Sequence, residues 1–190
     1  GGYTEYTFNP NGQPPFVVVP NRDVFAVGAA EGGGPMVRVY SPVDNSLVAA
    51  FPAYEPTIRG GVIVAVGDVT GDGIPDIITG TGNGGGPVVK VFDGATFFEI
   101  ASFFAYEPTF RGGVYVAVAD VDGDGRAEII TGTGVGGGPA VKIFNGQNYA
   151  QRFALFAYEP QTRNGVIVAG ADVDGDGTAE IITGGGAGGG

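Results

Sequence analysis

Cysteine, histidine and tryptophan are all absent from this sequence of 190 residues. Their absence excludes disulfide bonds, thiolate chemistry, imidazole catalysis and zinc sites built from Cys and His. The apolar runs are no longer than a strand, so we expect no insertion into a membrane.

Positive charge is also scarce. Nine Lys and Arg residues stand against 20 Asp and Glu, which gives a net charge of −11. This balance argues against nucleic acid and anionic membrane surfaces as partners. The chain begins with Gly1 and Gly2 and shows no signal peptide, which indicates a processed chain or a fragment.

Few side chains are available for catalysis. Without His or Cys, and with Ser41, Ser46 and Ser102 as the only serines, the sequence offers no nucleophile–base pair. A carboxylate pair of the kind that glycosidases use stays open as an alternative. We expect that the protein is not an enzyme.

What the sequence has in abundance is glycine, with 38 residues that recur at regular intervals. The tetrapeptide Ala-Tyr-Glu-Pro begins at residues 53, 105 and 157, and Gly-Gly-Gly-Pro begins at residues 32, 84 and 136. Asp68, Asp120 and Asp172 keep the same interval of 52 residues. Unrelated markers that share one spacing indicate an internal repeat.

Each repeat contains four short runs that are typical of strands. In the unit at residues 113–164 these runs are residues 113–119, 127–131, 139–144 and 152–158, separated by Gly, Asn and Asp. No run has a sustained helical period. Four antiparallel strands in every 52 residues are typical of a β-propeller blade. A sandwich with duplicated segments is the alternative, and a parallel β-helix has much shorter repeats.

The predicted fold is therefore all-β, a β-propeller or a partial propeller of four-stranded antiparallel blades. The 190 residues form a single repeat domain. We expect an N-terminal strand or arm at residues 1–15, a degenerate blade at 16–60, blades at 61–112 and 113–164, and a half blade at 165–190.

The most specific chemistry lies in three acidic loops at residues 68–76, 120–128 and 172–180. Oxygen-bearing side chains occupy loop positions 1, 3, 5 and 9, glycine occupies position 6, and position 7 offers its backbone carbonyl. This pattern resembles the first nine positions of an EF-hand loop, in which oxygens surround a hard cation. The predicted metal ligands are Asp68, Thr70, Asp72, Ile74, Asp76, Asp120, Asp122, Asp124, Arg126, Glu128, Asp172, Asp174, Asp176, Thr178 and Glu180.

Solvated acidic turns are the simpler interpretation of any one such loop. The three loops occupy the same position in their repeats and hold 11 of the 20 acidic residues. Without a cation these carboxylates would repel one another. We therefore predict three Ca²⁺ sites. Mg²⁺ is the weaker candidate because it requires a small octahedral shell. The loop with Thr70 has one carboxylate fewer and is expected to bind most weakly.

With these loops and the hydrophobic strand that follows each, the sequence resembles the FG-GAP repeats of integrin-α propellers and of bacterial extracellular FG-GAP/VCBS-type proteins. The resemblance covers residues 60–190 well and residues 16–59 weakly. It implies a structural calcium ion that ties together the first two strands of a blade. The usual Phe-Gly…Gly-Ala-Pro signature is replaced here by Thr-Gly-x-Gly-Gly-Gly-Pro. In the first unit Phe16, Val18 and Pro20 occupy ligand positions, so we expect no ion there.

Two further motifs carry weaker expectations. The glycine stretches lack the Lys and the following helix of a phosphate-binding loop, which favours tight packing between blades. Each Tyr-Glu-Pro corner has an Arg four residues after the Glu, as in Glu55 and Arg59. We expect a local ion pair, with an exposed Tyr/Arg surface for a glycan or protein as the alternative.

These observations favour an extracellular or cell-surface, calcium-stabilised module with a structural or adhesion role. Extracellular calcium is millimolar, so even weak loops would fill there. Because the repeats are nearly identical and offer no singular pocket, we expect a homo-oligomer or polymer. The alternative is a recognition module that binds a glycan or protein through its loops.

The ends of the chain suggest how such an assembly would form. The last unit stops after its second predicted strand, whereas residues 3–8 alternate like a strand outside the first unit. We expect the N-terminal segment to complete a blade, preferably in another chain, which would give a ring or a filament. A truncated chain is the alternative.

Overall fold

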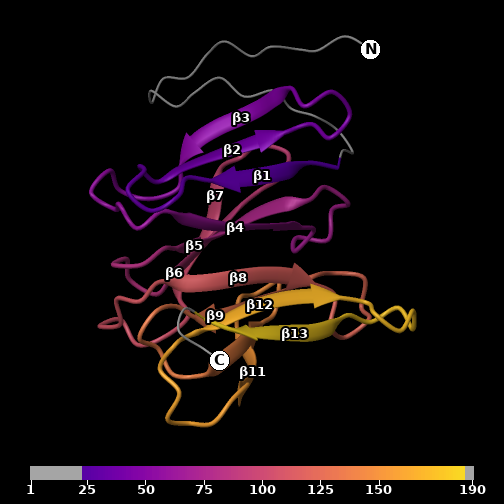
Figure 1. Cartoon of the computed structure of the whole chain (residues 1–190). Helices are drawn as coiled ribbons and strands as arrows, with labels where there is room; N and C mark the ends of the chain where they lie inside the picture. The colour runs from indigo at the N-terminus through magenta and orange to yellow at the C-terminus, as the bar shows by residue number, and fades with distance from the viewer. Residues whose placement is uncertain (1–22, 187–190) are drawn as a thin grey trace.

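The computed structural model describes residues 23–186, which form antiparallel β-strands joined by turns (Figure 1). Within this range no helix occurs, and so none has the length and apolarity needed to cross a membrane. The strands are β1 (Phe25–Gly28), β2 (Met36–Tyr40), β3 (Leu47–Pro52), β4 (Val62–Gly67), β5 (Asp76–Thr81), β6 (Val88–Phe92), β7 (Glu99–Phe104), β8 (Val114–Ala119), β9 (Glu128–Thr133), β10 (Ala140–Phe144), β11 (Gln151–Phe156), β12 (Val166–Ala171) and β13 (Glu180–Gly185).

The strands form four sheets, each of which follows the chain order. Two sheets have four strands, β4-β5-β6-β7 and β8-β9-β10-β11. β1-β2-β3 and β12-β13 form smaller sheets, and by the 52-residue spacing β1 corresponds to β5. Figure 1 shows the sheets following one another down the molecule, with β1 next to β4, β4 next to β8, and β8 next to β12. The all-β class and the four-stranded antiparallel sheets are confirmed.

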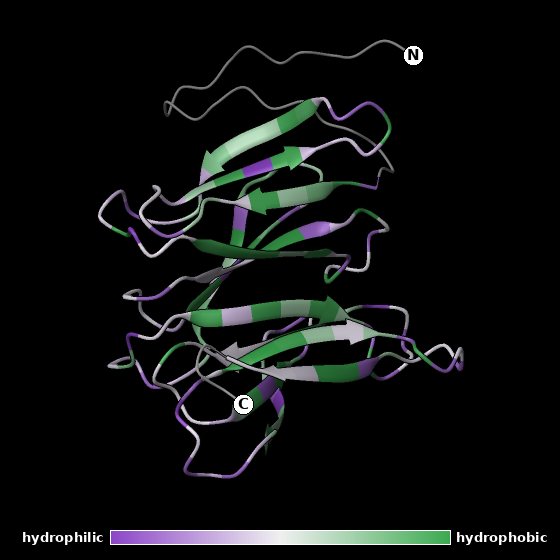
Figure 2. Cartoon of the chain, viewed as in Figure 1, coloured by the Kyte–Doolittle hydropathy of each residue, from purple (hydrophilic) through white to green (hydrophobic). Residues whose placement is uncertain are grey.

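The hydrophobic core lies between successive sheets rather than within one of them. β5 and β9 are buried along their whole length, because a neighbouring sheet covers each face. Figure 2 shows the first strands of the two four-stranded sheets, β4 and β8, as mostly hydrophobic. One core cluster joins the first two sheets, a second joins the two four-stranded sheets, and a third reaches β12.

The Tyr of the Ala-Tyr-Glu-Pro motif links one sheet to the next. The Tyr54 hydroxyl lies 2.9 Å from Thr79 Oγ1 and donates to Val88 O at 3.1 Å. Tyr106 repeats this arrangement by donating to Ala140 O at 3.0 Å, and burial raises the pKa of both phenols. The motif therefore serves to hold two sheets together.

The ion pair expected after this motif does not form. Arg111 Nη1 instead donates to the carbonyls of Pro108 and Phe110, at 2.6 and 2.8 Å. Between residues 23 and 186 the ion pairs join Lys90 to Glu99, and Arg152 to Asp122 and Glu128. The arginine thus closes its own turn by binding two backbone carbonyls.

Several expectations fall on residues outside the described range. These are the N-terminal strand at residues 3–8, the unit boundary at residue 16, and the altered loop positions Phe16, Val18 and Pro20.

Candidate metal centre

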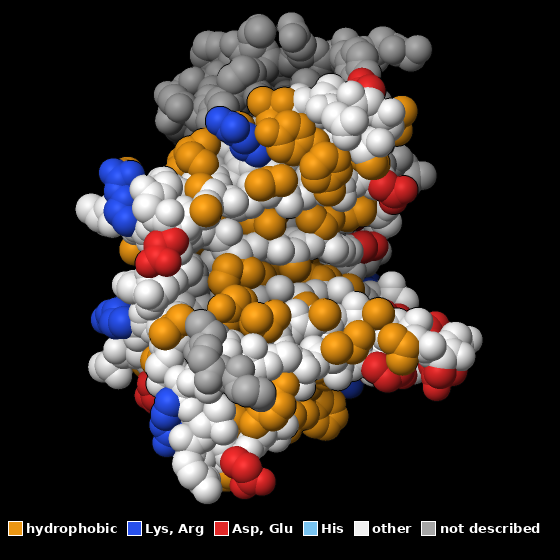
Figure 3. Space-filling view, viewed as in Figure 1, with side chains coloured by type: hydrophobic (Ala, Val, Ile, Leu, Met, Phe, Trp, Pro, Cys, Tyr) orange, Lys and Arg blue, Asp and Glu red, His pale blue; other side chains and the backbone are white. Residues whose placement is uncertain are grey.

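The three acidic loops join the first strand of a unit to its second, β4 to β5, β8 to β9 and β12 to β13. Because the units are stacked in one orientation, the loops lie along one side of the molecule. Figure 3 shows acidic side chains at this side, most clearly at the loop between β12 and β13. Hydrogen bonds between residues close in sequence shape each loop.

The aspartate at position 1 organises each loop. Asp120 accepts the N–H of Gly123 at 2.7 Å with one oxygen and the N–H of Gly125 at 2.8 Å with the other. Both glycines have positive φ, 74° and 86°, which side chains rarely adopt. Asp68 and Asp172 accept the corresponding glycine amides in their own loops.

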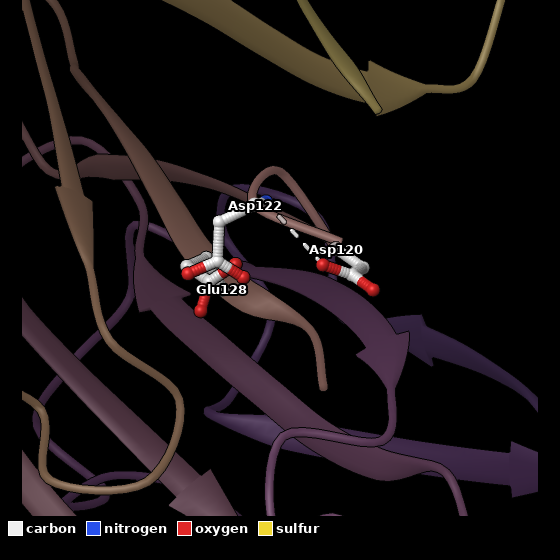
Figure 4. Close-up of side chains that lie close together, drawn as sticks. All are labelled: Asp120, Asp122 and Glu128. Carbon is white, nitrogen blue, oxygen red and sulfur yellow. Dashed lines mark hydrogen bonds between the residues drawn. The ribbon is translucent and has the colours of Figure 1, made fainter. Parts of the chain in front are cut away.

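Two of the loops gather three carboxylates around one point. Ligand oxygens of Asp120, Asp122 and Glu128 all lie within 4.8 Å of one another, and Asp172, Asp174 and Glu180 form the same cluster. Figure 4 shows the carboxylates of Asp122 and Glu128 side by side, with Asp120 across from them. Ca²⁺ binds oxygens at about 2.3–2.6 Å, so oxygens on opposite sides of one ion would be about 5 Å apart.

Glu128 provides the test of whether a cation fits. Its side chain is 1% exposed, and its Oε1 is buried without a hydrogen-bond partner. Oε2 accepts the N–H of Val121 at 3.2 Å. Burial raises the pKa of this carboxyl, since the charged form loses its hydration. A buried carboxylate oxygen without a donor, beside two other carboxylates, fits a metal ligand.

The loop at residues 68–76 has a different arrangement. Asp76 Oδ2 accepts the N–H groups of Val69 and Thr70, each at 3.0 Å, and Oδ1 accepts the N–H of Gly94 at 2.9 Å. Burial raises the pKa of Asp76, and these three hydrogen bonds oppose that shift. Both oxygens are thus engaged, and no cluster of three acidic groups forms at this loop within the described residues.

The remaining predicted ligands lie in the loops but outside the two clusters. At position 5, Asp72, Asp124 and Asp176 accept the backbone N–H of position 7 at 2.8 or 2.9 Å. Those donors belong to Ile74, Arg126 and Thr178. The Thr70 hydroxyl donates to Asp68 at 3.4 Å. The metal-binding roles of positions 5 and 7 and of Thr70 stay predictions.

Adjacent loops are joined through the backbone. The N–H of Ala127 donates to Asp68 O at 2.9 Å, and that of Ala179 donates to Asp120 O at 2.7 Å. Position 8 of one loop therefore holds position 1 of the loop before it.

Sequence reasoning missed one residue of this site, Arg152 on β11. Its Nη1 forms a hydrogen bond with Asp122 Oδ2 and lies 3.5 Å from Glu128 Oε1. The hydrogen bond raises the pKa of Arg152 and lowers that of Asp122. A signal was present, because the residues one and two repeats earlier are Ile100 and Val48.

A groove lies at the opposite ends of the strands, between the first two sheets. Its volume is about 300 Å³, and its lining combines polar side chains, three glycines and Ile58. The lining residues are Glu31, Thr57, Ile58, Arg59, Gly60, Asn83, Gly84 and Gly85.

Solved structures with a similar fold include three rhamnogalacturonan lyases. The exotype lyase YesX aligns with a TM-score of 0.63 and 17% identity over 96% of this chain and 41% of its own. The lyase YesW aligns with a TM-score of 0.60 and 18% identity over 87% of this chain and 38% of its own. The lyase PL11 of Bacillus licheniformis aligns with a TM-score of 0.57 and 19% identity over 95% of this chain and 39% of its own. The chain thus spans about two fifths of each lyase.

These structures correct one expectation from the sequence. The lack of His, Cys and a serine–base pair led us to expect that the protein is not an enzyme, and that conclusion is wrong. The fold occurs in enzymes, so missing nucleophiles do not exclude catalysis.

Among curated proteins none matches this sequence. Residues 68–131 match the family described as FG-GAP-like repeat. The matched range starts at Asp68 and ends in β9, so it contains the first two acidic loops and the strands between them. The family that the loops suggested is confirmed in this range: residues 68–131 carry an FG-GAP-like repeat.

Proposed function

We propose that this chain is a calcium-stabilised β-propeller module in which Ca²⁺ holds together the first two strands of a blade. The single observation that carries the proposal is Glu128 Oε1, a buried carboxylate oxygen without a donor beside Asp120 and Asp122. Glu128 begins β9, and the two aspartates follow β8. A cation bound to all three would therefore bridge the two strands and remove the repulsion among the carboxylates.

The packing of the sheets supports the propeller architecture. Successive sheets meet through their first two strands, and the same close approach recurs at each junction. A Cβ on Gly80 would lie 2.2 Å from Val114 O, and one on Gly132 would lie 2.0 Å from Val166 O. Repeated sheets that contact through inner strands are the elements from which propellers are built.

The experiment is thermal unfolding in excess Ca²⁺ and in excess chelator, with Mg²⁺ as the comparison cation. Ligand at 100 times its dissociation constant stabilises a protein by about 2.7 kcal/mol per site. Two filled clusters would then raise the midpoint by about 10 °C or more in a chain of this size. Elemental analysis of the dialysed protein measures the bound calcium directly.

The matched variants are Glu128→Gln with Glu180→Gln, and Glu107→Gln as a control. The double variant removes one ligand from each cluster and should lose most of the calcium-induced shift. Glu107 is exposed and far from both clusters, so its variant should keep the full shift. The proposal would be overturned if calcium did not change the unfolding midpoint of the unmodified protein and elemental analysis found no bound calcium.

The setting that suits this function is extracellular or at the cell surface, where millimolar calcium would keep the loops filled. A structural or adhesion role by self-assembly is supported by apolar side chains that the described residues leave exposed. Phe153 and Phe156 on β11 are 59% and 65% exposed, and Ile182 on β13 is 46% exposed. Exposed apolar side chains that gather into a patch mark sites of association with a partner.

A second candidate function is recognition of an acidic glycan at the groove between the first two sheets. Arg59, Asn83 and Glu31 supply hydrogen-bonding groups there, and proteins of this fold include lyases of rhamnogalacturonan. The experiment incubates the protein with rhamnogalacturonan and measures both binding and cleavage. Arg59→Gln should weaken binding at the groove, whereas Arg163→Gln should leave it unchanged.

A further inference from the structure

Arg152 brings a fixed positive charge to one of the two carboxylate clusters. It lies on β11, the fourth strand of its sheet, and reaches the loop that joins β8 to β9. Its guanidinium forms a hydrogen bond with Asp122 and lies 3.5 Å from Glu128 Oε1. Asp122 and Glu128 are two of the three acidic residues in the cluster.

The contact with Glu128 leaves its oxygen available. Oε1 accepts no hydrogen bond, so Arg152 offsets its charge across 3.5 Å without occupying its lone pairs. The Arg152 side chain is 30% exposed, and every residue of β11 is exposed. The guanidinium can therefore leave the cluster for water without disturbing a packed core.

The chain contains its own comparison for this site. The loop at residues 172–180 has the same acids at the same positions as the loop at 120–128, Asp, Asp, Asp and Glu. Among the described residues no Lys or Arg forms an ion pair with it. Glu180 Oε2 accepts the N–H of Val173 at 2.9 Å, as Glu128 Oε2 accepts that of Val121. The two loops differ in burial, since Glu128 is buried and Glu180 is not, and in position 7, which is Arg126 in one loop and Thr178 in the other. Only the loop at residues 120–128 has, among the described residues, an arginine ion-paired with its carboxylates, and the variants of Arg152 isolate that difference.

Resting on the proposed function, we propose that Arg152 is a tethered cation that competes with Ca²⁺ for the cluster of Asp120, Asp122 and Glu128. The competition makes this site weaker than the cluster of Asp172, Asp174 and Glu180. Filling the site displaces the guanidinium from Asp122, because a divalent cation and a guanidinium at the same carboxylates repel each other. Arg152 therefore sets the calcium concentration at which this blade is stabilised.

The test is a calcium titration followed at two backbone amides by NMR. Gly125 N–H donates to Asp120, and Gly177 N–H donates to Asp172, so each amide reports its own loop. The variant is Arg152→Ile, which places at this position the residue found one repeat earlier, at position 100. Arg152→Gln repeats the test with a polar side chain. Arg163→Gln, at the other end of the sheets, is the control for a lost positive charge.

In the unmodified protein the amide signal of Gly177 should reach saturation at a lower calcium concentration than that of Gly125. Arg152→Ile and Arg152→Gln should tighten the affinity measured at Gly125 by about fivefold or more, since one competing charge is removed. The affinity at Gly177 should stay within about twofold, and Arg163→Gln should change neither.

Two results would overturn the proposal, and they are distinguishable. If Gly177 titrates but both Arg152 variants leave the affinity at Gly125 unchanged or weaker, Arg152 does not compete with calcium. If neither amide responds to calcium in any variant, the proposed calcium function fails together with this inference.

Discussion

At the scale of single residues, position 9 of the acidic loops shows how one methylene group changes the role of a carboxylate. Asp76 is short and accepts three backbone N–H groups, from Val69, Thr70 and Gly94. Glu128 is longer, accepts the N–H of Val121, and keeps one buried oxygen without a donor. The shorter side chain thus fixes its loop directly, whereas the longer one has an oxygen for a cation.

This difference predicts the effect of Asp76→Asn. An amide has a single acceptor oxygen, and its NH₂ group would face a backbone donor. We expect a loss of about 2–3 kcal/mol in the free energy of unfolding, because buried N–H groups lose a charged acceptor. Urea unfolding in the presence of chelator measures the loss without any contribution from calcium.

The control for this prediction is Asp72→Asn in the same loop. Asp72 accepts the local N–H of Ile74, which an asparagine oxygen can also accept. We expect no measurable loss of stability in chelator. Equal losses in the two variants would show that Asp76 does not anchor the loop.

At the scale of elements, the second strand of each unit needs glycine where the next sheet crosses it. Gly132 on β9 lies so close to β12 that an added Cβ would be 2.0 Å from Val166 O. Gly184, one repeat later on β13, has no described atom within 4 Å of its added Cβ. The glycine is therefore required by the neighbouring sheet, because neither residue has a positive φ.

The two glycines form a matched pair for mutation. Gly132→Ala should lower the free energy of unfolding by about 1–3 kcal/mol, as overpacking forces the two strands apart. Gly184→Ala should leave stability close to that of the unmodified protein. Thermal unfolding of both variants checks this, and a harmless Gly132→Ala would contradict the close packing of β9 on β12.

At the scale of the whole molecule, the surface over β12 and β13 differs from the equivalent surfaces inside the stack. Ile78 and Ile130 are fully buried under a following sheet, whereas Ile182 is 46% exposed. Figure 3 shows hydrophobic side chains exposed over β12 and β13. This surface has the composition of a junction between two sheets.

The proposed self-assembly predicts that this surface associates with another copy. In calcium the native mass should exceed the 19.1 kDa of one chain, and Ile182→Lys should return it toward that value. A lysine at the centre of an apolar contact would carry an unpaired charge into it. Val43→Lys, at a position 90% exposed in a turn, is the control. A monomer at about 0.1 mM with and without calcium would contradict this proposal.

Local pattern was sufficient for much of this protein. Residues 127–131, 139–144 and 152–158 were predicted as strands and appear as β9, β10 and β11 within two residues at each end. The acidic loops and their glycines also followed from sequence, since Asp120 bonds amides three and five residues away. The three ligand positions that converge, 1, 3 and 9, were among those predicted. The alternation of residues in a strand and the hydrogen bonds of a turn depend on residues close together in the chain. Both can therefore be predicted from the sequence.

Tertiary structure decided what each repeated residue does. The bond between Tyr54 and Thr79, the one between Asp76 and Gly94, and the pairing of Arg152 with Asp122 span 25, 18 and 30 residues. The sequence by itself determined where the strands and acidic loops occur, because each is a local pattern repeated every 52 residues. Burial by a neighbouring strand or sheet decides which carboxylate oxygen lacks a hydrogen-bond donor and which glycine has no room for a side chain. Only the packed structure defines that burial.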